Sequence, residues 1–411
     1  MVQLGVQTQW IPLVSSVVFS FIGYFSLVLL IPRSKGAFIK AGLRGKDMAK
    51  KDNPIIPEAL GILVAGVYLV LLFLFIPLPF INDIAFETEE PEVFKRFISQ
   101  IAGILSICCT IFLGMSDDIF DLRWRDKVFL PTVASLPLLM VYYVTYHLTV
   151  IVVPIPLRPY FGTTVDIGIL YYLYMGSLAV FCSNSINILA GINGLEVGQS
   201  VVIATSLIIF NCLELYFQCC QMEAHLLSLY LLIPFLGCSL ALLRYNWYPA
   251  EVFVGDTYCY FAGMLFAVVG ILGHFSKTLL LMFIPQIVNF VYSVPQLFRM
   301  VPCPRHRLPR YDPDIDKSHA SETQFKSKDL KAISSLVIFI LKTCRLLKVK
   351  ESTVDGEKWM TCNNMTLNNL VLIHSGPMRE DKLCIVILVL QVTCSCVAFV
   401  IRYPLAYLFY S

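Results

Sequence analysis

Residues 252–272 read VFVGDTYCYFAGMLFAVVGIL, a run of 21 residues with a single charged side chain, Asp256. A helix of about 20 apolar residues crosses the hydrocarbon core of a bilayer, which is about 30 Å thick. This run is therefore long enough to span a membrane. An aspartate beside hydrocarbon is costly and marks a candidate functional site. The same stretch thus predicts a membrane fold and a position for its chemistry.

The composition of the whole chain agrees with a membrane protein. Of 411 residues, 57% are hydrophobic and 14% are charged, whereas soluble domains carry about 25% charged residues. This composition excludes a soluble globular protein, a disordered chain and a secreted disulfide scaffold. We predict an all-α polytopic membrane protein with about ten transmembrane helices. The ten candidate segments are 11–32, 59–81, 97–115, 128–146, 167–190, 197–216, 224–243, 252–272, 278–298 and 383–401.

Lysine and arginine are unevenly distributed between the loops. The loop after the first segment carries seven of them, the stretch after the ninth is also basic, and the loop after the second is acidic. Cytoplasmic loops of membrane proteins are enriched in lysine and arginine. We therefore expect the odd-numbered loops to be cytosolic and both termini to lie on the opposite side.

The chain is expected to have three parts. These are a transmembrane catalytic core of nine helices at 1–298, a cytosolic insert at 299–382, and a tenth transmembrane helix with a short tail at 383–411. The insert is expected to be a small mixed α/β module. Its apolar run at 334–341 is too short to span and fits a buried strand or an interfacial helix equally well. The net charge of +3 gives no reason to expect a nucleic-acid partner.

Four clusters of polar residues fall at the predicted cytosolic ends of the spans, although they are far apart in the sequence. Carboxylate and amide oxygens suit Mg²⁺, and basic side chains suit a diphosphate. Together they indicate phosphoryl transfer, in which positioning and charge neutralisation do most of the catalysis. Alone, each cluster could be a helix cap, a turn or a basic stop-transfer patch. The clusters are Asp117, Asp118 and Asp121; Asn184 and Asn187; Asp256; and Arg305, His306 and Arg307.

Four strings resemble signature blocks of the polyprenyl-phosphate N-acetylhexosamine-1-phosphate transferases. They are FLGMSDD at 112–118, NSINILAGINGLE at 184–196, VFVGDT at 252–257 and PCPRHR at 302–307. The long insert is similar to that of the eukaryotic branch, which uses UDP-GlcNAc and dolichyl phosphate. The resemblance implies a Mg²⁺-dependent transfer of N-acetylglucosamine 1-phosphate to dolichyl phosphate, with release of UMP. That reaction begins the lipid-linked oligosaccharide pathway for protein N-glycosylation.

The resemblance also implies roles for individual residues. The catalytic residues would be Asp117, Asp118, Lys127, Asp256, Arg305 and Arg307, with Asn187 and Asp256 holding Mg²⁺. UDP-GlcNAc would contact Lys46, Asp47, Met48, Glu58, Asn193, Phe253, Arg305, His306 and Arg307, with Asn193 hydrogen-bonded to uracil and Phe253 stacked on it. Dolichyl phosphate would contact Lys127, Val180, Phe181, Cys182, Ser183, Asn184, Ser185, Ile186, Asn187 and Ile188.

Two questions about the acidic residues stay open. Asp121 stands where close animal relatives have asparagine, so its role is undecided. Asp117 could be a general base or an electrostatic organiser. A phosphate monoester is already mostly dianionic at neutral pH, because its second pKa is about 6. No strong base is then required, which favours the organiser.

The resemblance further implies an endoplasmic reticulum membrane protein that forms a homodimer, with its site facing the cytosol and both termini lumenal. Three alternatives remain: a nucleotide-sugar transporter, a non-catalytic scaffold that presents the insert, and a bacterial-type enzyme using undecaprenyl phosphate. Transporters usually show two related halves and polar groups near the bilayer midplane. No repeat is visible in this chain, and its charged residues gather at one face. The long insert argues against a bacterial-type enzyme.

Overall fold

A computed structural model describes residues 10–81, 83, 91–217, 221–304, 306–354, 357–406 and 408. Within these residues, nine helices are long and apolar enough to cross a membrane, or ten if one bent pair counts as a single span. The prediction of an all-α polytopic membrane protein is confirmed. Seven of the spans are α2 (Trp10–Lys40), α5 (Pro91–Phe120), α6 (Trp124–Tyr146), α8 (Ile169–Ile188), α9 (Leu195–Tyr216), α10 (Met222–Asn246) and α11 (Gly255–Leu272). The other two are α3 (Gly61–Phe75), continued through η1 (Leu78–Phe80), and α16 (Glu380–Val400), continued through η4 (Ile401–Leu405).

The ninth predicted segment, 278–298, is a bent pair of helices. Helices α12 (Ser276–Met282) and α13 (Ile284–Leu297) meet at Phe283 with a bend of 71°. Pro285 is the second residue of α13. Proline has no N–H to donate to the preceding turn and fits best at the start of a helix. The predicted segment 278–298 is thus a bent pair of helices, which is either one broken span or a re-entrant loop.

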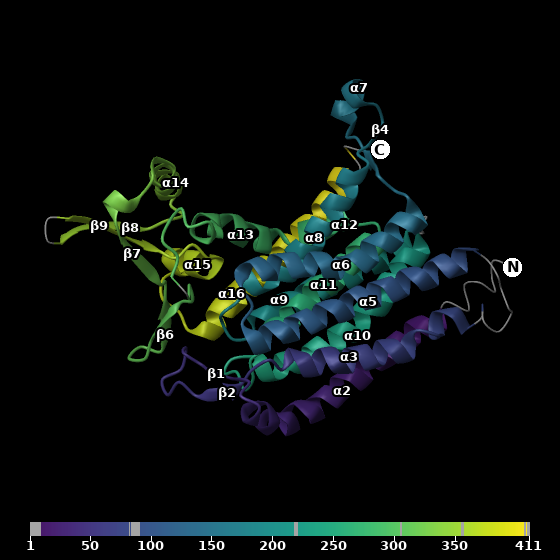
Figure 1. Ribbon diagram of the computed structural model, residues 1–411, viewed down its shortest axis with the longest axis horizontal. Helices are drawn as coiled ribbons and strands as arrows, with labels where there is room; N and C mark the ends of the chain where they lie inside the picture. The colour runs from purple at the N-terminus through teal and green to yellow at the C-terminus, as the bar shows by residue number, and fades with distance from the viewer. Residues whose placement is uncertain are drawn as a thin grey trace.

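Helix α11 lies at the centre of the bundle. Within its apolar window 89% of the residues are buried, against 22% for α2, which lies along one edge (Figure 1). Glycine allows the neighbouring helices to approach α11 closely. A Cβ at Gly263 would lie 2.2 Å from the carbonyl oxygen of Cys182 on α8, and a Cβ at Gly114 of α5 would lie 2.5 Å from Thr257 Cα. The three helices that carry polar clusters, α5, α8 and α11, are thus packed with their backbones in contact.

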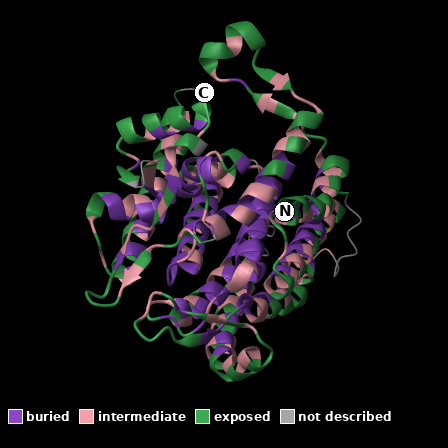
Figure 2. Ribbon diagram, turned by 60° about the vertical axis from the view of Figure 1, so that its left-hand side comes forward, coloured by how far each residue is buried: buried purple, intermediate pink, exposed green. Residues whose placement is uncertain are grey.

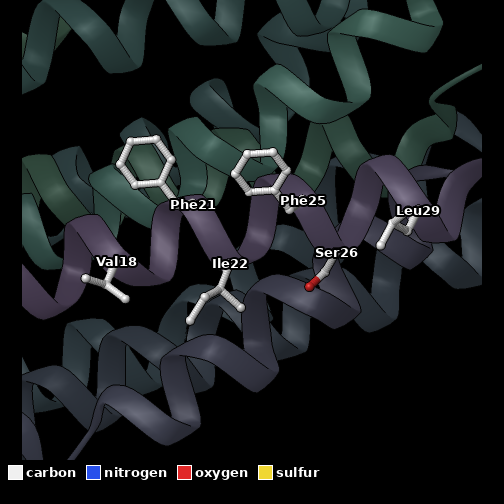
Figure 3. Close-up of a pocket in the computed structure, with 6 residues that line it drawn as sticks. All are labelled: Val18, Phe21, Ile22, Phe25, Ser26 and Leu29. Carbon is white, nitrogen blue, oxygen red and sulfur yellow. The ribbon is translucent and has the colours of Figure 1, made fainter.

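The outer faces of the bundle are apolar, and buried residues gather inside it (Figure 2). Phe21 and Phe25 on α2, for example, are each 61% exposed. An open recess on this helix is lined by apolar side chains and one serine hydroxyl (Figure 3). Soluble proteins rarely expose continuous apolar surface of this kind, so these faces suit contact with lipid. The lining residues are Val18, Phe21, Ile22, Phe25, Ser26 and Leu29.

The insert folds as a small mixed α/β module at one end of the bundle, on the left of Figure 1. Its antiparallel sheet has the order β7–β9–β8, with Glu322 paired to Asn363 and Val349 to Cys362. The apolar run at 334–341 forms part of α14, so the helical alternative is the one adopted. The elements are β7 (Glu322–Lys326), η3 (Ser327–Asp329), α14 (Ala332–Thr343), β8 (Val349–Val354), β9 (Glu357–Asn363) and α15 (Leu367–Ser375).

The remaining elements are short. They lie in the connections between helices, except η4, which continues α16 at its carboxyl-terminal end. Three antiparallel hairpins pair β1 with β2, β3 with β4, and β5 with β6. The elements are β1 (Arg44–Lys46), β2 (Ile55–Pro57), η1 (Leu78–Phe80), β3 (Val150–Val152), η2 (Ile155–Leu157), α7 (Arg158–Phe161), β4 (Thr164–Asp166), β5 (Arg310–Asp312), β6 (Lys317–His319) and η4 (Ile401–Leu405).

The contact between α8 and α11 gives a stability prediction. We expect Gly263→Ala to destabilise the protein by about 1–3 kcal/mol, because overpacking a dense core costs about that much and the clash here is with backbone. The matched control is Gly66→Ala on α3, where an added Cβ meets nothing within 4 Å. Thermal unfolding of both variants in detergent measures the difference. Equal melting temperatures for the two variants would contradict the packing described here.

Candidate active site

The amino-terminal end of α11 is held by a carboxylate from another helix. Asp118, near the end of α5, accepts hydrogen bonds from Asp256 N at 2.6 Å and Thr257 N at 3.1 Å, and also from the Thr257 hydroxyl. The first N–H groups of a helix have no partner inside it, and its positive end attracts anions. Asp118 therefore caps α11 and fixes the position of Asp256.

Gly255 makes this cap sterically possible. Its φ is +76°, and a Cβ there would lie 2.7 Å from Asp118 Oδ1 and 2.7 Å from Ala59 Cα. Glycine reaches positive φ values without a steric penalty and leaves room for close approach. The glycine before Asp256 in the sequence thus has a structural reason.

Lys127, in the first turn of α6, lies between two carboxylates. Its Nζ is 3.0 Å from Asp117 Oδ2 and 3.0 Å from Asp256 Oδ2. Asp117 is only 3% exposed, and it also accepts hydrogen bonds from the Tyr260 hydroxyl at 3.0 Å and from Leu122 N at 3.0 Å. Both oxygens of Asp117 are therefore occupied. This carboxylate is placed to orient Lys127.

Two asparagines on α8 complete this network. Asn187 donates from Nδ2 to Asp256 Oδ1 at 2.7 Å. Asn184, one turn earlier, donates to the carbonyl oxygens of Lys127 at 3.2 Å and Val180 at 2.9 Å. The structure thus brings together the polar clusters of α5, α8 and α11. Their helix ends lie on the side of the bundle that carries the insert (Figure 1).

Only one face of the segment 180–188 is accessible. Its buried side chains point toward the inside of the bundle, where the backbone of Cys182 and Ser183 contacts α11. Because an α-helix has 3.6 residues per turn, neighbouring residues of one segment fall on different faces, some buried and some accessible. The partly exposed residues are Val180, Phe181, Asn184, Asn187 and Ile188, and the buried ones are Cys182, Ser183, Ser185 and Ile186.

The hairpin β1–β2 lies against the loop that precedes α11. Phe253 N donates to the carbonyl oxygen of Pro57 at 2.8 Å, and a Cβ at Gly45 would lie 3.0 Å from the Phe253 ring. Glu58 follows β2. Loss of hydration raises the pKa of its carboxyl group, with further contributions from the negative charges of Asp118 and Asp256. Glu58 is therefore close enough to Asp118 and Asp256 to interact with them electrostatically.

The predicted nucleotide residues at the end of β1 and in the loop that follows it separate into two groups. Asp47 is 3% exposed, and its Oδ2 accepts a hydrogen bond from Asn193 Nδ2 at 3.1 Å. Lys46 and Met48 have exposed side chains. The structure brings Asp47 and Asn193 into contact and leaves Lys46 and Met48 at the surface.

The loop after α13 covers the turn that precedes α9. A Cβ at Gly191 would lie 2.0 Å from Leu308 Cδ2, and the carbonyl oxygen of Arg307 accepts a hydrogen bond from Asn369 Nδ2 at 2.9 Å. Arg307 Nη1 is buried without a hydrogen-bond partner among the described residues. Burial also lowers the pKa of this guanidinium. His306 is exposed, whereas Arg305 lies outside the described residues.

An unpaired buried guanidinium nitrogen has unused capacity to bind an anion. Arginine binds phosphate oxygens through its planar fork of N–H donors. Arg307 thus offers a cationic donor on the loop after α13, separate from the one that Lys127 offers. Both groups are cations of the kind that binds the oxygens of a diphosphate.

Known proteins resemble this chain over nearly its full length. The UDP-N-acetylglucosamine–dolichyl-phosphate N-acetylglucosaminephosphotransferase of Saccharomyces cerevisiae is 47% identical to it, over 92% of this chain and 88% of the relative. The protein of the same name from Dictyostelium discoideum is 45% identical, over 97% and 91% respectively. The chain belongs to this phosphotransferase family. The resemblance indicated by the four sequence blocks is confirmed.

Two further comparisons agree with this family. The phosphotransferase of the same name from Schizosaccharomyces pombe is 43% identical, over 97% of this chain and 94% of the relative. Residues 100–274 match the family described as Glycosyl transferase family 4. That range contains the polar clusters of α5, α8 and α11 and ends before the insert.

The donor set at α11 fits Mg²⁺ in its chemistry. Magnesium takes one or two protein carboxylates and completes its shell with water and substrate phosphates. Asp256 supplies a carboxylate and Asn187 an amide oxygen, already joined to each other by a hydrogen bond. Among the described residues, no group of three or more His, Cys, Asp and Glu side chains could hold a metal by itself. An ion here would therefore need oxygens from substrate or water.

Sequence analysis missed four residues that the structure places in these networks. Thr257 and Tyr260 donate to Asp118 and Asp117, respectively. Glu380 accepts from Asn193, and Lys50 pairs with Glu380. Thr257 carried a usable signal, because it directly follows Asp256 in the VFVGDT block. Glu380 carried none, since its partners are more than 180 residues away in the sequence.

The cap on α11 can be tested with Asp118→Asn. We expect a loss of stability of about 2 kcal/mol or more, because hydrogen bonds to a charged group contribute about 1.5–3 kcal/mol and an amide NH₂ cannot accept from Asp256 N or Thr257 N. Asp52→Asn, at an exposed position in the loop between β1 and β2, is the matched control. Thermal unfolding of both variants measures the effect. Wild-type stability in Asp118→Asn would show that the cap contributes nothing.

Proposed function

We propose that this protein transfers N-acetylglucosamine 1-phosphate from UDP-GlcNAc to dolichyl phosphate, giving GlcNAc-diphosphodolichol and UMP. This is the first committed step of the lipid-linked oligosaccharide pathway for protein N-glycosylation. The observation that carries the proposal is Lys127, held between Asp117 and Asp256 beside Asn187 at the end of the spans. The names of relatives at 43–47% identity support the same reaction.

The reaction depends more on neutralising the negative charge of the phosphate groups than on proton transfer. An oxygen of the dolichyl phosphate dianion attacks the β-phosphorus of UDP-GlcNAc, and the bond between that phosphorus and the bridging oxygen breaks to release UMP. An ammonium group has three N–H donors. Asp117 and Asp256 use two of those on Lys127, so the third can bind an oxygen of the attacking phosphate. The exposed face of the segment 180–188 would receive the first part of the lipid.

The nucleotide sugar would bind on the side of the β1–β2 hairpin. Phe253 would stack on the uracil ring and Asn193 would hydrogen-bond to it, while Arg307 and His306, with Arg305, would contact the diphosphate and the N-acetyl sugar. The buried, unpartnered Nη1 of Arg307 supports this assignment. Asp47 and Glu58 belong to the same hairpin region, and Lys46 and Met48 would contact the ligand from the surface.

We also propose that Mg²⁺ is required and that Asp256 and Asn187 hold it. A bound Mg²⁺ would neutralise charge on the phosphoryl oxygens of the leaving group. Asp256 is held from three directions, by Asp118 at its backbone and by Lys127 and Asn187 at its carboxylate. Its charge is therefore fixed in place before substrate binds.

Charge distribution supports a location for the site. The basic loop after α2 and the basic insert lie on the same side as the polar clusters, so we propose that this side faces the cytosol and that both termini are lumenal. We propose residence in the endoplasmic reticulum membrane from the family. A homodimer and the three-part division at 298/299 and 382/383 are likewise proposed.

The metal assignment predicts that Asp256→Asn abolishes turnover in a folded protein. Loss of one electrostatic contact in a site of this kind costs about 10²–10³ in rate. The assay mixes purified protein, dolichyl phosphate, radiolabelled UDP-GlcNAc and Mg²⁺, with and without EDTA, and counts label extracted into organic solvent. Glu251→Gln, an exposed acidic residue on the same loop, is the matched control and should keep wild-type activity.

Two outcomes would overturn parts of this assignment. If Asp256→Asn keeps more than about a tenth of the wild-type rate, Asp256 is not a metal ligand. If wild-type protein binds UDP-GlcNAc but makes no lipid-extractable product, the proposed transferase activity is wrong. Uptake of UDP-GlcNAc into vesicles would then test the alternative that the protein is a nucleotide-sugar transporter.

The environment of Asp117 predicts the behaviour of Asp117→Asn. We expect a rate lowered by about 10²–10³ at every pH, because the carboxylate that orients Lys127 is lost. Tyr260→Phe removes one hydrogen bond to the same carboxylate and should give a smaller loss with an unchanged pH profile. Rates measured across the neutral and alkaline range provide the comparison. Recovery of the Asp117→Asn rate at high pH, with unchanged metal affinity, would instead support a general base.

A further inference from the structure

Three segments that are far apart in the sequence meet at the side chain of Asn193. They are the loop between β1 and β2, the turn before α9, and the first residue of α16, Glu380. Asn193 and Glu380 are each 4% exposed. One oxygen of the Glu380 carboxylate accepts from Asn193 N at 2.7 Å, and the other accepts from Asn193 Nδ2 at 3.0 Å.

These contacts determine which way the Asn193 amide is turned. Its Nδ2 donates to two carboxylates, those of Glu380 and Asp47. An amide oxygen in that position would face two acceptors and would be repelled, so only one of the two amide orientations is compatible with the surroundings. Lys50 Nζ lies 2.8 Å from Glu380 Oε2 and 3.4 Å from Asp47 Oδ2, and its charge balances both carboxylates.

In this orientation the amide oxygen of Asn193 lacks a hydrogen-bond donor. Asn193 Oδ1 is buried and has no hydrogen-bond partner among the described residues. A buried acceptor without a partner lowers stability unless a donor is supplied. The Phe253 ring packs on β1, the strand that precedes Asp47, so one hairpin positions both the ring and the amide. Under the proposed function, a base stacked on Phe253 is the ligand that would supply a donor to this oxygen.

We infer that Glu380 is a positioning residue that, with Asp47, holds the Asn193 amide with Oδ1 available to a ligand donor, and thereby makes the site selective for uracil over cytosine. This inference rests on the proposed function. Uracil and cytosine have the same ring shape and stack equally on phenylalanine. They differ at N3, which is a donor in uracil and an acceptor in cytosine. Oδ1 can accept from N3–H of uracil, whereas it would face a second acceptor in cytosine.

A purely structural role for Glu380 makes a different prediction. If Glu380 only anchored the start of α16 through Lys50, its loss would weaken the protein or the binding of every nucleotide to the same extent. A role in setting the amide orientation changes the preference between bases. The ratio of UDP to CDP affinity therefore separates the two, whereas activity alone does not.

The test measures binding of UDP and of CDP to the full-length protein in detergent by titration calorimetry. Wild type should prefer UDP. In Glu380→Gln the ratio of the two affinities should fall by about tenfold or more, because a neutral amide can donate as well as accept and no longer dictates the orientation of Asn193. Asp381→Asn, the next residue on α16, pairs with Arg379 and not with Asn193, so it is the matched control and should keep the wild-type ratio.

The outcomes are distinct. An unchanged ratio in folded Glu380→Gln overturns the inference, even if both nucleotides bind more weakly. If that variant does not fold, Asp47→Asn carries the same test, since it removes the second carboxylate: a reduced ratio supports the inference and a wild-type ratio overturns it. Equal affinity of the wild type for UDP and CDP also overturns it. UDP preference in a protein that makes no lipid-linked product would overturn the proposed function while leaving the base selectivity intact.

Discussion

The carboxylate of Asp118 at the start of α11 is the contact on which the membrane half of this molecule depends. It supplies acceptors to the unpaired N–H groups of a helix that is almost wholly buried. A buried anion is tolerated only where hydrogen bonds replace its hydration, and the first turn of α11 provides them. Because Asp256 is the second residue of that helix, the same contact sets the position of the carboxylate that binds Lys127 and Asn187.

A second network of buried carboxylates lies on the side where we propose that the nucleotide binds. Asp47 and Glu380 accept from Asn193 and share the charge of Lys50, which also lies 3.9 Å from the centre of the Tyr248 ring. Each network therefore combines carboxylates, one lysine and an asparagine at the end of a membrane span. The two networks differ in which hydrogen-bonding group remains available to a ligand. The first network leaves a lysine N–H, which suits a phosphate oxygen, and the second leaves an amide oxygen, which suits a base N–H.

The spans were predictable because hydropathy is a local property, and nine of the ten predicted segments are single helices. The bend at Phe283 was not predicted, because apolar composition is the same on both sides of it and Pro285 is compatible with either a kink or a helix start. For the run at 334–341 the sequence left a strand and a helix equally possible. The insert resolves this, since its sheet is completed by β7, β8 and β9 and the run packs beside it as α14.

The membrane architecture, the family and the residue types of the site could all be predicted from the amino-acid sequence, because these follow from composition and from short contiguous motifs. The tertiary structure alone decided the partners. It paired Lys127 with both Asp117 and Asp256, buried four of the residues in the segment 180–188 while leaving the others accessible, and brought Glu380 to Asn193. The physical reason is that a hydrogen bond needs its two groups within about 3 Å. The number of residues between two groups in the sequence does not predict their distance in space, which is set only when the helices pack together.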